Sequence, residues 1–179
     1  MTEQLPMFSA GPTLEEARNG LQEALSRGDG ALCPCCDQHA KVYRRKLNAS
    51  MARALLWLVR HYESTRSWCD VPRQAPAWLL RSRELPKLAY WGLIQQQVND
   101  DDPTKRCSGI WRPTQIGCLF AHGRRTVASH VEIYNGAVIG HSDKQITIKD
   151  ALGKRFNYAE LMGSSSSTCL LYTSDAADE

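Results

Sequence analysis

Apolar residues recur at helical spacing in the first half of the chain. The longest stripe predicts a core helix over 48–63, because side chains three and four positions apart share one helix face. The stripe consists of Leu47, Met51, Ala54, Leu55, Leu58, Val59 and Tyr62, with Arg53 and Arg60 on the opposite side. A shorter stripe predicts a helix that begins at Thr13, which forms a capping-box pattern with Glu16, and ends at Gly28.

Two further helices are predicted after a loop-like stretch. One spans 76–81, with Pro76 where a first helical turn tolerates proline. The other spans 84–97, where apolar residues again return every three or four positions. Short apolar segments on either side of the polar stretch 98–106 indicate two strands joined by a loop.

The pattern changes to strands towards the end of the chain. Asn135-Gly136 separates two alternating segments, which predicts a β-hairpin with a type I′ turn. The other elements expected here are a helix over 114–122 capped by Thr114, a strand over 145–148, and a helical turn over 157–162.

The order of helices and strands between 48 and 122 is that of a winged helix-turn-helix unit. Local sequence agrees, since Leu88–Ile94 followed by Gly109–Gly117 resembles the stretch of bacterial winged-helix regulators in which a recognition helix leads into a Gly-Leu-Ile strand. We therefore predict an α+β fold with a winged helix-turn-helix core. An N-terminal helix with a cysteine knuckle and a small C-terminal β-hairpin extension complete it.

Domain boundaries follow from the same pattern. Cys169–Glu179 resembles a translated sequencing adapter, so we expect this tail to be artefactual and the native C-terminus to be undefined beyond about residue 162. The expected segments are a disordered lead-in over 1–12, the N-terminal helix and cysteine knuckle over 13–47, the winged-helix domain over 48–122, the hairpin and terminal helical turn packed on the core over 123–162, and a disordered or artefactual tail over 163–179.

Composition narrows the class of protein. With 179 residues, 42% apolar and 23% charged, the chain fits one globular domain with a small appendage. It has neither the long apolar run of a membrane span nor the basic and apolar start of a signal peptide, so we expect no membrane partner and a location in the cytoplasm of a bacterial host cell. Removing the three acidic residues of the tail raises the formal charge from +3 to +6, which favours a polyanionic partner.

Double-stranded DNA is the partner that a winged helix and a basic chain favour. The turn between the two predicted helices would bring Arg81 and Arg83 to the DNA backbone. The solvent face of the 84–97 helix would offer side chains to the major groove, and further cations would lie on or near the wing. The groove residues are Lys87, Tyr90, Gln95 and Gln96, and the wing residues are Lys105, Arg106 and Arg112. Asp100, Asp101 and Asp102 oppose this prediction, because phosphate repels carboxylates.

These residues lead to two hypotheses about function. The first is a non-enzymatic, regulatory DNA-binding protein, because no catalytic triad, phosphate loop or pair of carboxylates stands out. The alternative is a protein-binding adaptor or an inhibitor of a host defence protein that uses the same fold as a scaffold. A homodimer is compatible with both.

Cys33-Pro34-Cys35-Cys36 is the candidate metal site. The spacing of Cys33 and Cys36 lets two thiolates face one zinc ion, but structural zinc normally takes four ligands and the sequence does not identify the other two. A structural turn with free thiols remains open. Thiol redox chemistry is disfavoured, because no strand and no thioredoxin-type aromatic residue precedes Cys33.

Four segments together resemble small uncharacterised proteins of tailed phages and prophages. They are Cys33–Asn48 with its CPxC and YRRKLN words, Tyr90–Ile94, Trp111–Thr114 and Asp150–Met162. The resemblance spans roughly 14–162 and implies a phage origin, without an activity or a set of site residues. It is compatible with a factor acting on transcription or replication and with an inhibitor of host defence.

Overall fold

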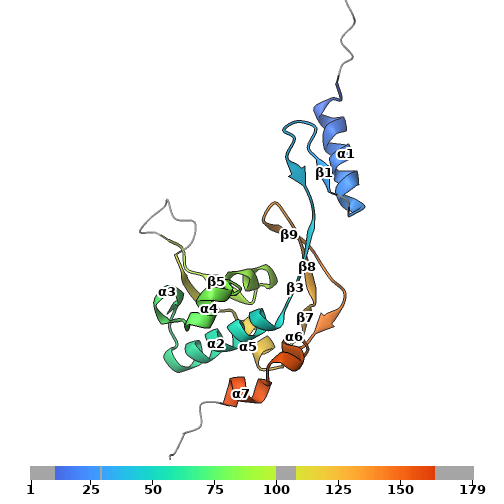
Figure 1. The fold of residues 1–179 in the computed structure, drawn as a ribbon. Coiled ribbons are helices and arrows are strands. Elements are labelled where there is room, and N and C mark those ends of the chain that lie inside the picture. Colours follow the sequence, from blue (N-terminus) through green and yellow to red (C-terminus); the bar gives the residue numbers. More distant parts are fainter. Residues whose placement is uncertain (1–10, 29, 100–107, 164–179) are drawn as a thin grey trace, which may run out of the picture. The chain divides into compact units, whose positions relative to one another are not determined.

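The computed structural model describes residues 11–28, 30–99 and 108–163 (Figure 1). The predicted α+β class is confirmed: helices combine with four small antiparallel sheets of two or three strands in the described part of the chain. The chain divides into two compact units, one formed by Met1–Lys46 with His130–Ser142 and the other by Leu47–Ser129 with Asp143–Glu179. Across the described segments, no helix combines the length and the apolar character that a membrane crossing requires.

The first unit consists of one helix and two small sheets. Helix α1, Leu14–Ser26, begins with the predicted capping box, in which the Thr13 hydroxyl accepts from the Glu16 N–H and the Glu16 carboxylate accepts from the Thr13 N–H at 2.8 Å. Strands β1 (Ala31–Leu32) and β2 (His39–Ala40) form a short hairpin, and the larger sheet has the order β3 (Tyr43–Lys46), β8 (His130–Tyr134), β9 (Ala137–His141).

The β8–β9 hairpin confirms the prediction made from Asn135-Gly136. Both residues have positive φ angles, 47° and 77°, as a type I′ turn requires. Along its whole length β3 also pairs with β8, from Tyr43 opposite Ile133 to Lys46 opposite His130. This long-range pairing joins the hairpin to the N-terminal segment of the chain.

The second unit is built around helix α2, Ala49–Thr65, whose N-cap Asn48 accepts from the Met51 N–H at 2.9 Å. Strands β4 (Cys69–Asp70), β5 (Ile94–Gln96) and β6 (Ile110–Pro113) form an antiparallel sheet in the order β4–β6–β5. The helices α3 (Val71–Gln74), α4 (Ala77–Ser82) and the 3₁₀ helix η1 (Leu85–Trp91) lie between β4 and β5 in sequence.

The remaining elements of this unit follow β6. They are α5 (Gln115–Ala121), the antiparallel pair β7 (Val127–Ala128) and β10 (Gln145–Ile146), α6 (Ile148–Leu152), the 3₁₀ turn η2 (Gly153–Arg155) and α7 (Tyr158–Gly163). Thr114 caps α5, as the sequence predicted.

The core of the second unit forms where α2 packs against α5, α6, β6 and η1. Leu55, Leu58, Leu93 and Phe120 are fully buried there. Trp91 and Trp111 are also buried, whereas Trp57 and Trp78 are half-buried. Trp91 Nε1 donates to the Ala128 carbonyl at 2.7 Å, which satisfies its buried polar atom.

The predicted helix over 84–97 was wrong in its length and its type. The 3₁₀ helix ends at Gly92, which has a φ of 64°, and the chain then enters β5. Thr114 fixes this ending, because its N–H donates to the Leu93 carbonyl at 3.0 Å and its hydroxyl to the Gly92 carbonyl at 2.6 Å. Gln95 and Gln96 therefore lie on a strand and not on a helix face.

Two further expectations differ from the structure. The predicted strand over 145–148 ends at Ile146, because Thr147 forms a capping box with Asp150 and begins α6. The expected boundaries at 13–47, 48–122 and 123–162 differ from the two units, since β8 pairs with β3 while 143–163 stays with the second unit. The expected lead-in and tail lie almost entirely outside the described residues.

Candidate functional site

The turn after α4 carries the two arginines expected to meet a DNA backbone. Arg81 lies in the last turn of α4, and Arg83 caps this helix in the left-handed region with a φ of 52°. Both residues are exposed, and neither forms an ion pair within the described residues. The guanidinium groups are therefore available for an anionic partner.

Lys87 and Tyr90, the two groove residues on η1, are only half-exposed. Lys87 Nζ donates to Glu84 Oε1 at 2.7 Å, and these side chains are 30% and 19% exposed. A lysine held in a half-buried ion pair is less available to phosphate. The most exposed positions of η1 are Pro86 and Ala89, whose side chains cannot form hydrogen bonds with base edges.

Gln95 faces Arg112 across the sheet instead of a groove. The two residues are opposite each other in the β5–β6 register. With the Gln95 amide assigned so that its oxygen faces the guanidinium, this oxygen accepts from Nη2 of Arg112 at 2.6 Å. The Arg112 guanidinium also stacks on Trp68, 4.3 Å from the ring centroid. Gln96 Nε2 contacts Ser108 Oγ at 3.4 Å. Lys105 and Arg106 lie outside the described residues, as do Asp100, Asp101 and Asp102.

Arg53 and Arg60, placed on the solvent side of their helix by the sequence pattern, are half-buried. The Arg53 guanidinium lies 3.8 Å from the Trp78 ring centroid and 5.0 Å from that of Phe156. Arg60 Nη1 donates to the Leu161 carbonyl at 2.8 Å. Both arginines therefore attach neighbouring segments to α2, a role that the sequence did not reveal because their partners are distant along the chain.

The cysteine cluster lies in the turn between β1 and β2. The Cys33 N–H donates to the Gln38 carbonyl at 2.8 Å, and the Asp37 N–H donates to the Cys33 carbonyl at 2.9 Å. The Cys35 N–H, followed by the thiol and the N–H of Cys36, lowers the pKa of Cys33. Cys33 is half-buried, whereas Cys35 and Cys36 are exposed.

The other described cysteines lie in the second unit. Burial raises the pKa of Cys69 to about 11 and also raises that of Cys118. Cys107 lies outside the described residues. Among the residues that the structure describes, no group of three or more His, Cys, Asp or Glu side chains is arranged to hold a metal ion.

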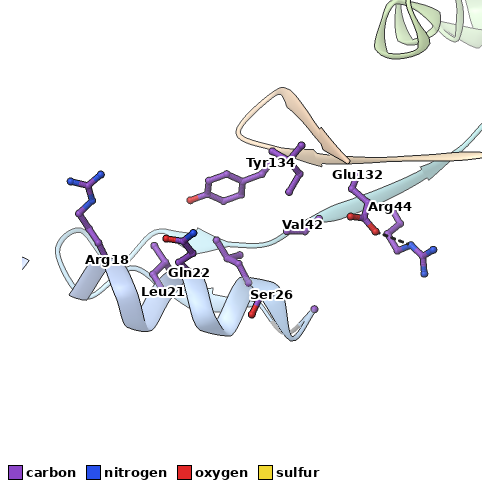
Figure 2. Close-up of a pocket in the computed structure, with 11 residues that line it drawn as sticks. Arg18, Leu21, Gln22, Ser26, Val42, Arg44, Glu132 and Tyr134 are labelled. Atoms are coloured by element: carbon purple, nitrogen blue, oxygen red, sulfur yellow. Dashed lines mark ion pairs between the residues drawn. The ribbon is translucent and has the colours of Figure 1, made fainter. Parts of the chain in front are cut away.

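A groove of about 750 Å³ lies within the first unit, between α1 and the β3–β8–β9 sheet. Figure 2 shows Leu21 and Gln22 of α1 on one side and Tyr134 on the other. Arg44 and Glu132 form an ion pair at its edge, with 3.6 Å between Nε and Oε1. The sequence did not reveal this groove, because it forms only when β3 pairs with β8.

No protein family, curated protein or solved structure matches this chain. The candidate sites therefore depend on their own geometry and chemistry.

Proposed function

We propose that the second unit is a winged-helix module that binds double-stranded DNA mainly through phosphate contacts, as a non-enzymatic regulator of phage type in the cytoplasm of a bacterial host. The observation that carries this proposal is the order α2, β4, α3, α4, η1, β5, β6 with sheet order β4–β6–β5, in which α4 and η1 correspond to the two helices of a winged helix and the four-residue α3 is additional. In a winged helix the first and second strands likewise flank the third, and two helices lie between the first and second strands.

Charge favours an anionic partner for this unit. Its sequence contains 16 lysines and arginines against 12 acidic residues, while the first unit has 6 against 7. The formal charge is therefore +4 for the second unit and −1 for the first. Exposed Arg81 and Arg83 are suited to phosphate oxygens, because a guanidinium donates several hydrogen bonds from one plane.

The side chains of η1 and of the strand after it favour binding through DNA phosphates over recognition of base edges. The exposed side chains of η1 are apolar, Lys87 is paired with Glu84, and Gln95 is paired with Arg112. Sequence is read by hydrogen bonds to base edges, which these residues are poorly placed to form. We therefore expect affinities for unrelated duplexes to differ by only a few fold.

The test is duplex binding across a salt series. The unaltered chain should show a steep negative slope of log affinity against log salt, and Arg81→Ala with Arg83→Ala should flatten it by roughly one unit per lost phosphate contact. Arg18→Ala with Lys41→Ala removes the same charge from the first unit and should leave the slope unchanged. An unchanged slope in the Arg81/Arg83 variant, or no binding at low salt, would overturn the proposal.

A protein-binding adaptor is the second candidate, favoured by exposed apolar side chains in the first unit. Leu14, Leu32, Tyr43 and Ile139 are 56% to 65% exposed, and the groove lies in the same unit. Ile139→Asp should abolish a stoichiometric complex isolated from nuclease-treated host lysate. Ile116→Asp, a change of similar chemistry in the second unit, should leave it intact. Equal effects of the two variants would argue against this surface.

A further inference from the structure

The backbone of the β1–β2 turn brings Cys33 and Cys36 to the separation of a disulfide. The Cys33 carbonyl accepts from the Asp37 N–H at 2.9 Å, so the two cysteines are the first and fourth residues of one tight turn. Asp37 closes this turn with a positive φ of 56°. The first and fourth residues of a tight turn have Cα atoms within about 7 Å of each other, and a disulfide requires about 4.4–6.8 Å.

A strand precedes Cys33, although the sequence indicated none. Strand β1 ends at Leu32, and the hydrogen bond from the Cys33 N–H to the Gln38 carbonyl at 2.8 Å extends the hairpin by one residue pair. The absence of a strand was one of two objections to thiol redox chemistry, and this objection was wrong. The turn is therefore attached to regular backbone that fixes its ends.

Hydrogen bonds to sulfur make Cys33 the attacking thiol of the pair. Its sulfur accepts from the Cys35 N–H and from the thiol and the N–H of Cys36. These donors stabilise a thiolate, and the thiolate is the form that attacks a disulfide. The contact between the two sulfurs also places Cys36 beside the atom that it would attack in a second step.

Cys35 is a poorer partner for either neighbour. Adjacent Cα atoms are about 3.8 Å apart, which is below the range for a disulfide between Cys35 and Cys36. Desolvation, followed by the charge of the Cys33 sulfur, raises the pKa of Cys35 and so favours its thiol form. We therefore expect Cys35 to stay reduced while its two neighbours react.

We propose that Cys33 and Cys36 are a modification site, at which a low-molecular-weight disulfide such as oxidised glutathione converts the two thiols into a reversible disulfide within the turn. Cys33 attacks one sulfur of the small disulfide, forms a mixed disulfide and releases one small thiolate. Cys36 then attacks the Cys33 sulfur and releases the second. The two small thiolates take up the two protons that the cysteines lose, so one disulfide is reduced as the other forms. This inference is independent of the proposed DNA binding.

The test is oxidation of the full chain by oxidised glutathione, after reduction and removal of metal with a chelator. The remaining thiols are then alkylated, and the chain is cleaved after lysine and arginine. Residues 28–41 form one peptide that contains all the cysteines of the turn. We expect this peptide to lose about two alkylatable thiols and to keep the one on Cys35, and excess dithiothreitol should restore both. A fully alkylated peptide, a bond that uses Cys35, or a bond between two chains would overturn the proposal.

Matched variants separate the attacking thiol from its partner. Cys36→Ser should retain the small thiol on Cys33 as a mixed disulfide, because no second thiol is placed to release it. Cys33→Ser should leave no disulfide in the turn, whereas Cys35→Ser should retain it. Cys107→Ser with Cys169→Ser is the control for the cysteines outside the described residues and should form the same product. Loss of the disulfide in this control would overturn the assignment of the pair.

Alkylation rates on the reduced, folded chain test the turn independently of the product. Cys118 is half-buried and has a raised pKa, so it is the internal reference. Cys33 should react faster than Cys118 by at least about tenfold, and unfolding in urea should remove most of this difference. Equal rates before unfolding would show that the turn does not activate Cys33.

Discussion

The two units of this protein differ in how much apolar surface they bury. Of the buried apolar side chains among the described residues, only Ala17, Val131 and Ile133 belong to the first unit. The second unit buries a continuous core around α2. The hydrophobic effect scales with apolar area removed from water, so we infer that the second unit folds by itself and that the first depends on additional contacts.

The largest expected loss of stability comes from a substitution in the core of the second unit. Phe120→Ala leaves a cavity in place of a fully buried ring and should lower the free energy of unfolding by about 3–5 kcal/mol. Urea denaturation followed by tryptophan fluorescence reports this unit alone, because all five tryptophans lie in it. Ile116→Ala on the same helix, 37% exposed, is the control and should cost about 1 kcal/mol or less. Equal losses would contradict the placement of α5.

Alanine substitution at two helical glycines should change stability in opposite directions. A Cβ at Gly117 would overlap the Leu93 carbonyl oxygen, so Gly117→Ala should destabilise the second unit by roughly 1–3 kcal/mol in the same denaturation experiment. Gly20 in α1 has no atom within 4 Å of such a Cβ, and alanine there should stabilise the helix by up to about 1 kcal/mol. Slower amide exchange in α1 would report this gain. Destabilisation by Gly20→Ala would mean that α1 packs more closely than described.

Among the residues that the structure describes, each unit contains a capping box that begins with threonine. Thr147→Ala should lower the stability of the second unit by about 1 kcal/mol, because α6 is part of its core. Thr13→Ala should increase amide exchange in α1 without moving the fluorescence transition, since α1 lies in the other unit. A shifted fluorescence transition in Thr13→Ala would show that the units unfold together.

The carboxylates of both capping boxes should make the stability of their helices depend on pH. The Thr13 N–H lowers the pKa of Glu16, and the Thr147 N–H lowers that of Asp150, because each donates to the carboxylate. A folded pKa below the unfolded value means that the stabilisation is present above the unfolded pKa and is lost as pH falls through the folded one. NMR titration should give the Asp150 carboxyl group a pKa below its ordinary value of 3.8. Thr147→Ala should return it towards that value.

The smallest expected losses of stability come from breaking two ion pairs, one at the end of α1 and one at η1. Arg27→Ala breaks a pair with Glu23 whose side chains are 61% and 69% exposed, and should cost less than about 0.5 kcal/mol. Lys87→Ala breaks the less exposed pair with Glu84 and should cost about 1 kcal/mol. Amide exchange in α1 measures the first change and tryptophan fluorescence the second. The reverse order would contradict the burial of the Lys87 pair.

Local chemistry explains why several elements could be predicted. Thr13, Asn48 and Thr114 each begin a helix by accepting from a backbone N–H three residues ahead, and Asn135-Gly136 turns a hairpin. In the candidate site, the sequence identified Arg81 and Arg83 as exposed cations. It did not reveal the partners of Lys87 and Gln95, because Glu84 and Arg112 can be assigned to them only when the short 3₁₀ helix and the strand register are known.

The sequence by itself determined where several of the helices begin, where the hairpin turns and that the two thiols share one loop, because these depend on groups a few residues apart. Only the tertiary structure decided that β3 joins β8, that the helix after Glu84 stops at Gly92, and that Arg53 stacks on Trp78. Each of these depends on a partner far along the chain. Such a contact forms only when the energy of packing and hydrogen bonding exceeds the entropy lost in closing the intervening loop.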